Sequence, residues 1–236
     1  MSNIMSISGV CWLRDSCNGK DCDKPFCLRR YKLDALYSAA LLSDTYKRAM
    51  VLNVDDDPVN DYDVFVRLAN IEQHIEEFIA EGNNLFIHSS NCGNGKTSWA
   101  VRMIKSYLNK IWAKAELGCH ALFISVPKLL IELKSDFGKN SSYVQYIAEN
   151  IETAEIVVWD DIAAKAGTEY EIDRLFRFID SRINLGKTNI YTTNLSAQEL
   201  SLMLGERLHS RICEASIDIE LKGSDKRKLQ EESRKW

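Results

Sequence analysis

The chain has 236 residues, 45% of them hydrophobic and 27% charged, which suits one medium domain or one domain with a small appendage. Its formal net charge of −4 argues against a broad basic surface that grips duplex DNA, whereas a narrow contact with single-stranded nucleic acid needs only a few basic side chains. No apolar run approaches the length of a membrane span, and the first residues lack an export signal. We therefore expect a cytoplasmic protein without membrane contact.

Four cysteines lie close together near the N-terminus, at Cys11, Cys17, Cys22 and Cys27. Cytoplasmic thiols are more often metal ligands than disulfides, and four thiolates on short loops can close a tetrahedral shell around Zn²⁺. The spacing lacks Cys-x-x-Cys pairs, so an iron–sulfur cluster and unligated thiols are the alternatives. We expect a zinc-bound module over residues 1–55 and a second domain over residues 56–236.

Two amphipathic helices are expected before the first core strand. An apolar stripe predicts one helix from about residue 28 to residue 48, whose apolar face could pack on the cysteine module or on another protein. Residues 53–60 are polar, acidic and interrupted by proline, which indicates a linker. A second stripe over residues 64–79 predicts a helix that ends near Gly82.

The run Ser-Asn-Cys-Gly-Asn-Gly-Lys-Thr at residues 90–97 follows a short apolar strand and precedes apolar residues at helical spacing. A phosphate-binding loop needs glycines that let backbone N–H groups turn inward, a lysine for the terminal phosphates and a hydroxyl for Mg²⁺. Gly93, Gly95, Lys96 and Thr97 supply these parts. The run therefore predicts a phosphate loop at the positive end of a helix dipole.

Ser90 departs from the usual pattern, which has its first glycine at that position. If the position requires a positive φ, serine costs on the order of 1 kcal/mol there. We expect the nucleotide to be held by residues of the loop and of the first helical turn, namely Asn91, Cys92, Gly93, Asn94, Gly95, Lys96, Thr97 and Ser98.

Residues 121–126 predict a second strand, followed by a helix from Pro127 and another helix over residues 143–150. The next strand, residues 156–159, is apolar throughout and runs directly into Asp160 and Asp161. Acids at the end of a central parallel strand lie where such sheets bind ligands. We expect Asp160 to hold Mg²⁺ with Thr97, directly or through water, and Asp161 to polarise the attacking water. The alternative is that both acids merely cap the helix expected at residues 169–184.

A further strand over residues 189–194 ends in Asn194, whose amide could bind a γ-phosphate or orient water. Arg207 and Arg211 lie four residues apart, so on a helix they share a face. If one of them reaches the nucleotide of a neighbouring subunit, ATP hydrolysis depends on assembly; the alternative is a solvated basic face. A last strand is expected at residues 216–221, before a charged run at the C-terminus.

Together these motifs resemble the DnaC/DnaI group of AAA+ ATPases, the loaders of the replicative helicase, and the related IstB-like transposition ATPases. The resemblance rests on the order and spacing of CGNGKT (92–97), WDDI (159–162), the helix with Leu175, Phe176, Ile179 and Arg182, YTTNL (191–195) and GERLHSRI (205–212). It implies an α/β three-layer AAA+ P-loop NTPase fold with a parallel central sheet. It also implies that Asn194 is the sensor-1 residue, that Arg207 or Arg211 is the arginine finger, and that Arg227 is a candidate sensor-2 residue.

The resemblance further implies ATP and Mg²⁺ as cofactors and slow ATP hydrolysis that assembly or DNA stimulates. The implied partners are a hexameric replicative helicase, gripped by the N-terminal module, single-stranded DNA, and further copies associated through the AAA+ domains. An IstB-like regulator of a transposase would share the ATP chemistry but assemble on duplex DNA. A third alternative is a regulator that binds a nucleotide or a partner without catalysis.

Overall fold

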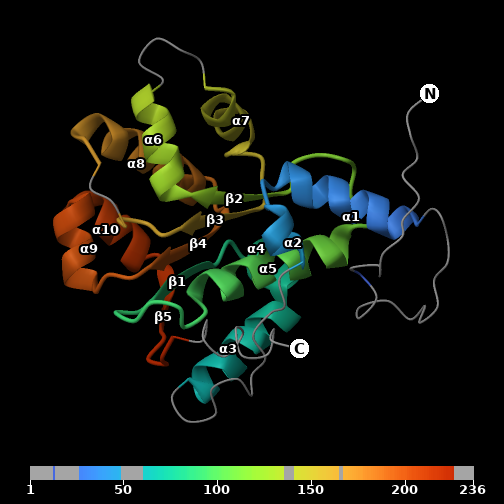
Figure 1. Cartoon of the computed structure of the whole chain (residues 1–236), viewed down its shortest axis with the longest axis horizontal. Helices are drawn as coiled ribbons and strands as arrows, with labels where there is room; N and C mark the ends of the chain where they lie inside the picture. The colour runs from blue at the N-terminus through green and yellow to red at the C-terminus, as the bar shows by residue number, and fades with distance from the viewer. Residues whose placement is uncertain (1–12, 14–26, 49–60, 136–140, 165–166, 226–236) are drawn as a thin grey trace, which may run out of the picture.

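The computed structural model describes residue 13 and residues 27–48, 61–135, 141–164 and 167–225 (Figure 1). Five strands form one parallel sheet in the order β2-β3-β4-β1-β5. The strands are β1 (Asn84–His88), β2 (Ala121–Ser125), β3 (Ile156–Asp160), β4 (Thr188–Thr193) and β5 (Ser216–Glu220). This confirms the expected α/β fold with a parallel central sheet.

Helices cover both faces of this sheet, so the molecule has three layers (Figure 1). One face carries α1 (Leu28–Ala39), α2 (Asp44–Arg48), α3 (Tyr62–Gln73), α4 (Ile75–Ala80) and α5 (Lys96–Ile111). The other face carries α6 (Val126–Ser135), α7 (Ser142–Asn150), α8 (Glu169–Asn184), α9 (Ala197–Leu204) and α10 (Glu206–Cys213). None of the helices in the described ranges is long and apolar enough to cross a membrane.

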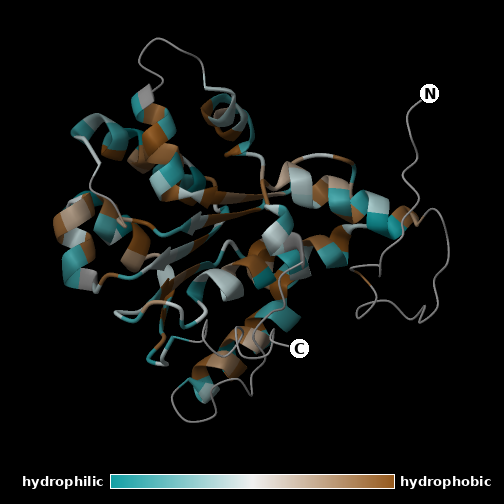
Figure 2. Cartoon of the chain, in the orientation of Figure 1, coloured by the Kyte–Doolittle hydropathy of each residue, from teal (hydrophilic) through white to brown (hydrophobic). Residues whose placement is uncertain are grey.

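Strand side chains alternate between the two layers, as the period of a β-strand requires. Leu85 and Ile87 of β1 pack in the cluster around α5, whereas Phe86 packs in the cluster around α8. Figure 2 shows hydrophobic residues along the strands, with hydrophilic residues interspersed on the covering helices. Because both of their faces are buried, β1, β2 and β3 are nearly continuous apolar runs, which made them predictable.

The strand order brings the two candidate motifs together. β1 and β3 lie on either side of β4, and all three strands are parallel. Their carboxyl ends therefore meet at one edge of the sheet, where residues 90–97 follow β1 and Asp161 follows β3. Parallel sheets bind ligands at this edge.

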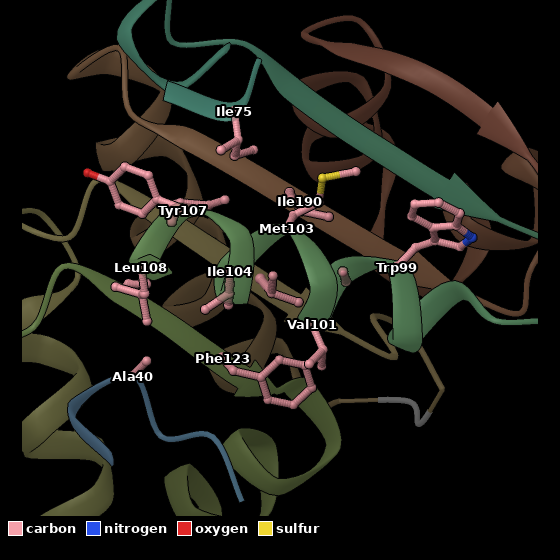
Figure 3. Packing of buried hydrophobic residues seen from close by; sticks show 14 of the residues in the cluster. Ala40, Ile75, Trp99, Val101, Met103, Ile104, Tyr107, Leu108, Phe123 and Ile190 are labelled. Carbon is pink, nitrogen blue, oxygen red and sulfur yellow. The ribbon is translucent and has the colours of Figure 1, made fainter. Parts of the chain in front are cut away.

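Helix α5 anchors the core on its side of the sheet. Trp99, Met103, Ile104 and Leu108 are fully buried, in one cluster with Ile75 of α4 and Ile190 of β4 (Figure 3). Burying such side chains stabilises the fold by roughly 1.5–3 kcal/mol each. The start of α5 at Lys96 is therefore held in place by packing along the whole helix.

The continuous helix expected over residues 28–48 is wrong. Helix α1 ends at Ala39, Leu41 has a φ of 60°, and the short helix α2 begins only at Asp44. The Ala40 carbonyl accepts a hydrogen bond of 2.8 Å from the Phe123 amide, so this turn covers part of the exposed edge of β2. The apolar stripe of α1 packs on α5 and β2, within the same core.

Residues 64–79 also form two helices, α3 and α4, which break at His74, and the turn at Gly82 has a φ of 68°. The expected linker at residues 53–60 and the domain boundary near residue 55 lie outside the described residues. The division into modules 1–55 and 56–236 stays a prediction.

Arg182, one of the residues behind the family resemblance, is buried in the core. Its guanidinium donates to Asn189 Oδ1 at 2.8 Å and to the carbonyls of Ala154 and Thr188 at 2.8 and 2.6 Å. Burial lowers the pKa of Arg182 to about 10. All these acceptors are neutral. Because Arg182 lies on α8, its hydrogen bonds connect this helix to β4 and to the turn before β3.

Candidate nucleotide-binding site

The loop over residues 90–97 contains glycines with positive φ angles, as expected for a phosphate loop. Gly93 and Gly95 have φ angles of 73° and 108°, in the region that glycine adopts without steric cost. Ser90 does not have a positive φ, since the non-glycine residues with that conformation in the described ranges are Leu41, Asp161 and Ala163. Serine therefore fits the first position of the loop without strain.

Lys96 lies inside the loop and is only 6% exposed. Its Nζ donates to the Asn91 carbonyl at 2.7 Å and to Asn94 Oδ1 at 3.0 Å. The Asn94 amide is itself fixed by donating to Ser89 Oγ at 2.6 Å. The loop thus positions a buried ammonium beside the N-terminus of α5, where the helix dipole also favours an anion.

The other residues expected to contact the nucleotide differ in their surroundings. Asn91 turns its amide away to the carbonyls of Lys222 and Gly223, at 3.1 and 3.3 Å. Cys92 is an exposed free thiol, and Ser98 is half-buried in the first turn of α5. Among the side chains of this group, those of Lys96 and Thr97 have the chemistry that phosphate and Mg²⁺ binding needs.

The Asp160 carboxylate joins the loop to the neighbouring strands. Its Oδ1 accepts hydrogen bonds of 2.8 Å from Thr97 Oγ1 and of 2.8 Å from Thr192 Oγ1. Burial raises the pKa of Asp160 to about 6; the Asp161 charge adds to this rise, while both threonine hydroxyls and Lys96 oppose it. Hydroxyl and carboxylate oxygens are the ligands that Mg²⁺ prefers, so Thr97 and Asp160 fit that ion.

Asp161 leaves strand β3 in the left-handed conformation, with a φ of 55°. Its amide donates to Thr192 Oγ1 at 2.9 Å, and its Oδ1 accepts a bond of 3.3 Å from the Asn194 amide. Such a conformation costs on the order of 1 kcal/mol and is typical of functional turns. Asp161 and Asn194, which were each expected to act on the nucleotide or the attacking water, thus contact each other in the structure.

The alternative that the two acids merely cap α8 is wrong. Thr168 caps this helix, because its hydroxyl accepts from the Glu171 amide while the Glu171 side chain accepts from the Thr168 amide. This reciprocal pair satisfies the start of α8 without either aspartate.

Thr192 is a site residue that the sequence analysis missed. It is fully buried, donates to Asp160 and accepts from the Asp161 amide, and its carbonyl accepts from the Ile162 amide at 2.8 Å. One side chain thus orients both acids. The sequence signal that could have identified Thr192 is a hydroxyl at a buried strand position, two residues before Asn194.

Arg207 and Arg211 lie on α10 and contact α8. The Arg207 guanidinium lies 3.9 Å from the centre of the Phe176 ring, and Arg211 Nε lies 3.0 Å from Asp180 Oδ1. Both arginines are exposed. Among the described residues, neither arginine forms a hydrogen bond, ion pair or ring contact with the loop or with the two acids of the same chain.

The cysteine cluster and Arg227 remain predictions. Cys11, Cys17, Cys22 and Arg227 lie outside the described residues, and Cys27 is a half-buried free thiol at the start of α1. Within the described ranges, no three His, Cys, Asp or Glu side chains are grouped to hold a metal ion.

The chain is similar to proteins of DNA replication. No family model matches the chain. The chain is 25% identical over 146 residues to the replicative helicase loader DnaC of Escherichia coli strain K12. The aligned residues cover 61% of this chain and 56% of that protein. The crystal structure of the DnaC helicase loader matches with a TM-score of 0.60 and 23% identity, over 76% of this chain and 100% of that one. The chain resembles the DnaC helicase loaders.

The fold is also similar to that of a replication initiator, DnaA, whose structure was determined with AMPPCP and single-stranded DNA. That structure matches with a TM-score of 0.53 and 18% identity, over 80% of this chain and 56% of the DnaA chain. These likenesses confirm the AAA+ P-loop fold. The present chain spans little more than half the length of the curated DnaC that it matches, at 56%.

Proposed function

We propose that this protein is an ATP-dependent loader of a replicative DNA helicase onto single-stranded DNA during replication initiation. The observation that carries the proposal is the grouping of Lys96, Thr97, Asp160, Asp161 and Asn194 at one edge of an AAA+ sheet, in a DnaC-like chain. The curated relative reported above is the replicative helicase loader DnaC, and no observation favours the IstB-like regulator over it.

The site residues have separate roles in the proposed hydrolysis of ATP. Lys96 and the amides at the start of α5 bind the terminal phosphates, and Thr97 with Asp160 holds Mg²⁺. When bound, Mg²⁺ neutralises charge on the phosphate oxygens. Asp161 polarises the water that attacks the γ-phosphorus as the bond to the ADP oxygen breaks, while Asn194 orients the γ-phosphate or that water.

Thr192 is proposed to position both acids. Replacing Thr192 with valine keeps the shape of the side chain but removes the hydroxyl that bonds Asp160 and the Asp161 amide. We expect kcat for ATP to fall by roughly ten- to a hundredfold, since loss of a residue that orients metal-ligating groups costs about that much, with a smaller change in KM. Steady-state kinetics measure both constants. Thr192→Ser keeps the hydroxyl and should restore most of the rate; a valine variant with unchanged kcat would remove this role.

The arginine finger is proposed to act between subunits, because Arg207 and Arg211 are exposed and contact α8 of their own chain. Alanine at the finger position should spare ATP binding and reduce assembly-stimulated hydrolysis by about 10³-fold or more. Arg177→Ala is the matched control, since Arg177 is an exposed arginine paired with Asp173 on α8. Normal hydrolysis in both single variants and in the double variant would exclude both arginines.

The proposed partners follow from the relatives and from the sequence. DnaC is a replicative helicase loader, and the DnaA structure contains single-stranded DNA. We propose that residues 1–55, with zinc on the four cysteines, grip a hexameric helicase while ATP-bound AAA+ domains associate side by side on single-stranded DNA. The direct test mixes the protein with its host's helicase and a circular single strand, and measures helicase transfer with and without ATP. Equal transfer of the helicase with and without ATP would contradict the proposal.

A further inference from the structure

The segment that follows β5, residues 221–225, is fastened to the phosphate loop. The Asn94 amide donates to the Leu221 carbonyl at 3.3 Å, and the Asn91 amide donates to the carbonyls of Lys222 and Gly223. The side-chain amides of two loop asparagines therefore bond to this segment. Neither interaction is needed for the β-sheet, which ends at Glu220.

A buried carboxylate binds backbone amides of the same segment. Asp61 is completely buried; its Oδ1 accepts from the Lys222 amide at 2.7 Å and its Oδ2 from the Gly223 amide at 2.8 Å. Charge-assisted bonds of this kind are about twice as strong as neutral ones. Because Asp61 immediately precedes α3, it couples this helix to the segment beside the loop.

The segment brings a second carboxylate against the loop itself. A Cβ atom placed on Gly93 would lie only 1.9 Å from Asp225 Oδ1, so the carboxylate rests directly on the glycine backbone. The loop is suited to an anion, because its amides, Lys96 and the α5 dipole are all positive there. An aspartate in this place adds negative charge where a polyphosphate has to approach.

We propose that residues 221–225 form a clasp that opposes nucleotide binding through the Asp225 carboxylate, with Asp61 as the positioning residue that keeps the clasp closed. This inference deepens the proposed function and rests on its nucleotide site. Nucleotide entry shifts the clasp, and the Asp61 bonds transmit that shift to α3. The occupancy of the site is thereby linked to the position of α3.

Asp225→Asn tests the charge with little change of shape. We expect it to bind ATP and ADP about tenfold more tightly than the wild type in the presence of Mg²⁺, because it removes one unit charge at short range from the phosphates. The gain should shrink as salt is raised. Titration with a fluorescent ATP analogue measures these affinities. Glu149→Gln is the control: it removes the same charge from α7, where exposed Glu149 accepts a hydrogen bond from Gln145, and should leave the affinity unchanged.

Asp61→Asn tests the positioning role. It should also tighten nucleotide binding, by less than tenfold, and the double variant should bind no more tightly than Asp225→Asn alone, because both changes act through one contact. Thermal unfolding without nucleotide distinguishes this positioning role from a purely structural one. A purely structural role of Asp61 would lower Tm in the variant and leave its affinity for nucleotide unchanged. If Asp225→Asn binds nucleotide no more tightly than the wild type, the clasp alone is overturned. If neither the wild type nor any variant binds nucleotide, both the clasp and the proposed function are overturned.

Discussion

Lys96→Ala is expected to abolish nucleotide binding, with an affinity for ATP at least a hundredfold weaker than that of the wild type. Lys96 is 6% exposed, and two acceptors of the loop hold its ammonium at the start of α5. A buried ammonium that bonds phosphate oxygens makes strong charge-assisted hydrogen bonds, and a hundredfold loss corresponds to about 2.7 kcal/mol. Isothermal titration calorimetry with ATP and Mg²⁺ measures this loss.

Lys114→Ala is the control for the loss of one positive charge. Lys114 is exposed just beyond α5 and pairs with Glu76 at 2.7 Å, so its replacement should leave ATP affinity within experimental error. An affinity of Lys96→Ala within threefold of the wild type would show that residues 90–97 do not bind the phosphates.

Asp160→Asn is expected to stabilise the protein in the absence of Mg²⁺ while removing ATP hydrolysis. Burial raises the pKa of Asp160 to about 6, whereas an aspartate in an unfolded chain titrates near 4. Between these values the folded state binds more protons than the unfolded state, so the free energy of unfolding falls as pH rises through this window. Above about pH 6 the whole penalty is present.

Asparagine removes this penalty because it is neutral at every pH, and its Oδ1 can still accept from Thr97 and Thr192. A shift of about two units corresponds to roughly 3 kcal/mol, which is the upper limit of the gain at pH 7.5. Urea unfolding without Mg²⁺ should show the gain at pH 7.5 and little of it at pH 4. Hydrolysis at pH 7.5 should fall by at least a hundredfold, since the carboxylate proposed to hold Mg²⁺ is gone.

The control for Asp160→Asn is Asp173→Asn, which changes a partly exposed acid paired with Arg177 and should alter stability by less than about 1 kcal/mol. An Asp160→Asn variant that is less stable than the wild type at pH 7.5 would contradict the account of this carboxylate.

Local patterns were sufficient to predict much of the fold. Apolar runs buried on both faces marked β1 and β3, and helix α8 has the expected bounds, Glu169–Asn184. The phosphate loop and Asp160–Asp161 were also recognisable, because each motif is a short contiguous run beside a strand. That they would meet at one edge followed from parallel strands alone.

The missed features depend on contacts between distant parts of the chain. The break after α1 arises where Ala40 bonds Phe123 at the edge of β2, which helical spacing cannot show. Thr192 acquires its role from Asp160, on the neighbouring strand. The bonds from Asp61 to Lys222 and Gly223 span most of the chain, so no local pattern indicates them.

The most direct test of the proposed loader is capture of its partners from its own host in the presence of ATP. The tagged Asp161→Asn variant should bind ATP, hydrolyse it slowly and remain assembled. We predict that it retains a hexameric replicative helicase, that Lys96→Ala does not, and that deletion of residues 1–50 abolishes the interaction. Recovery of a transposase in place of the helicase, or equal recovery of the helicase with Lys96→Ala, would contradict an ATP-dependent helicase loader.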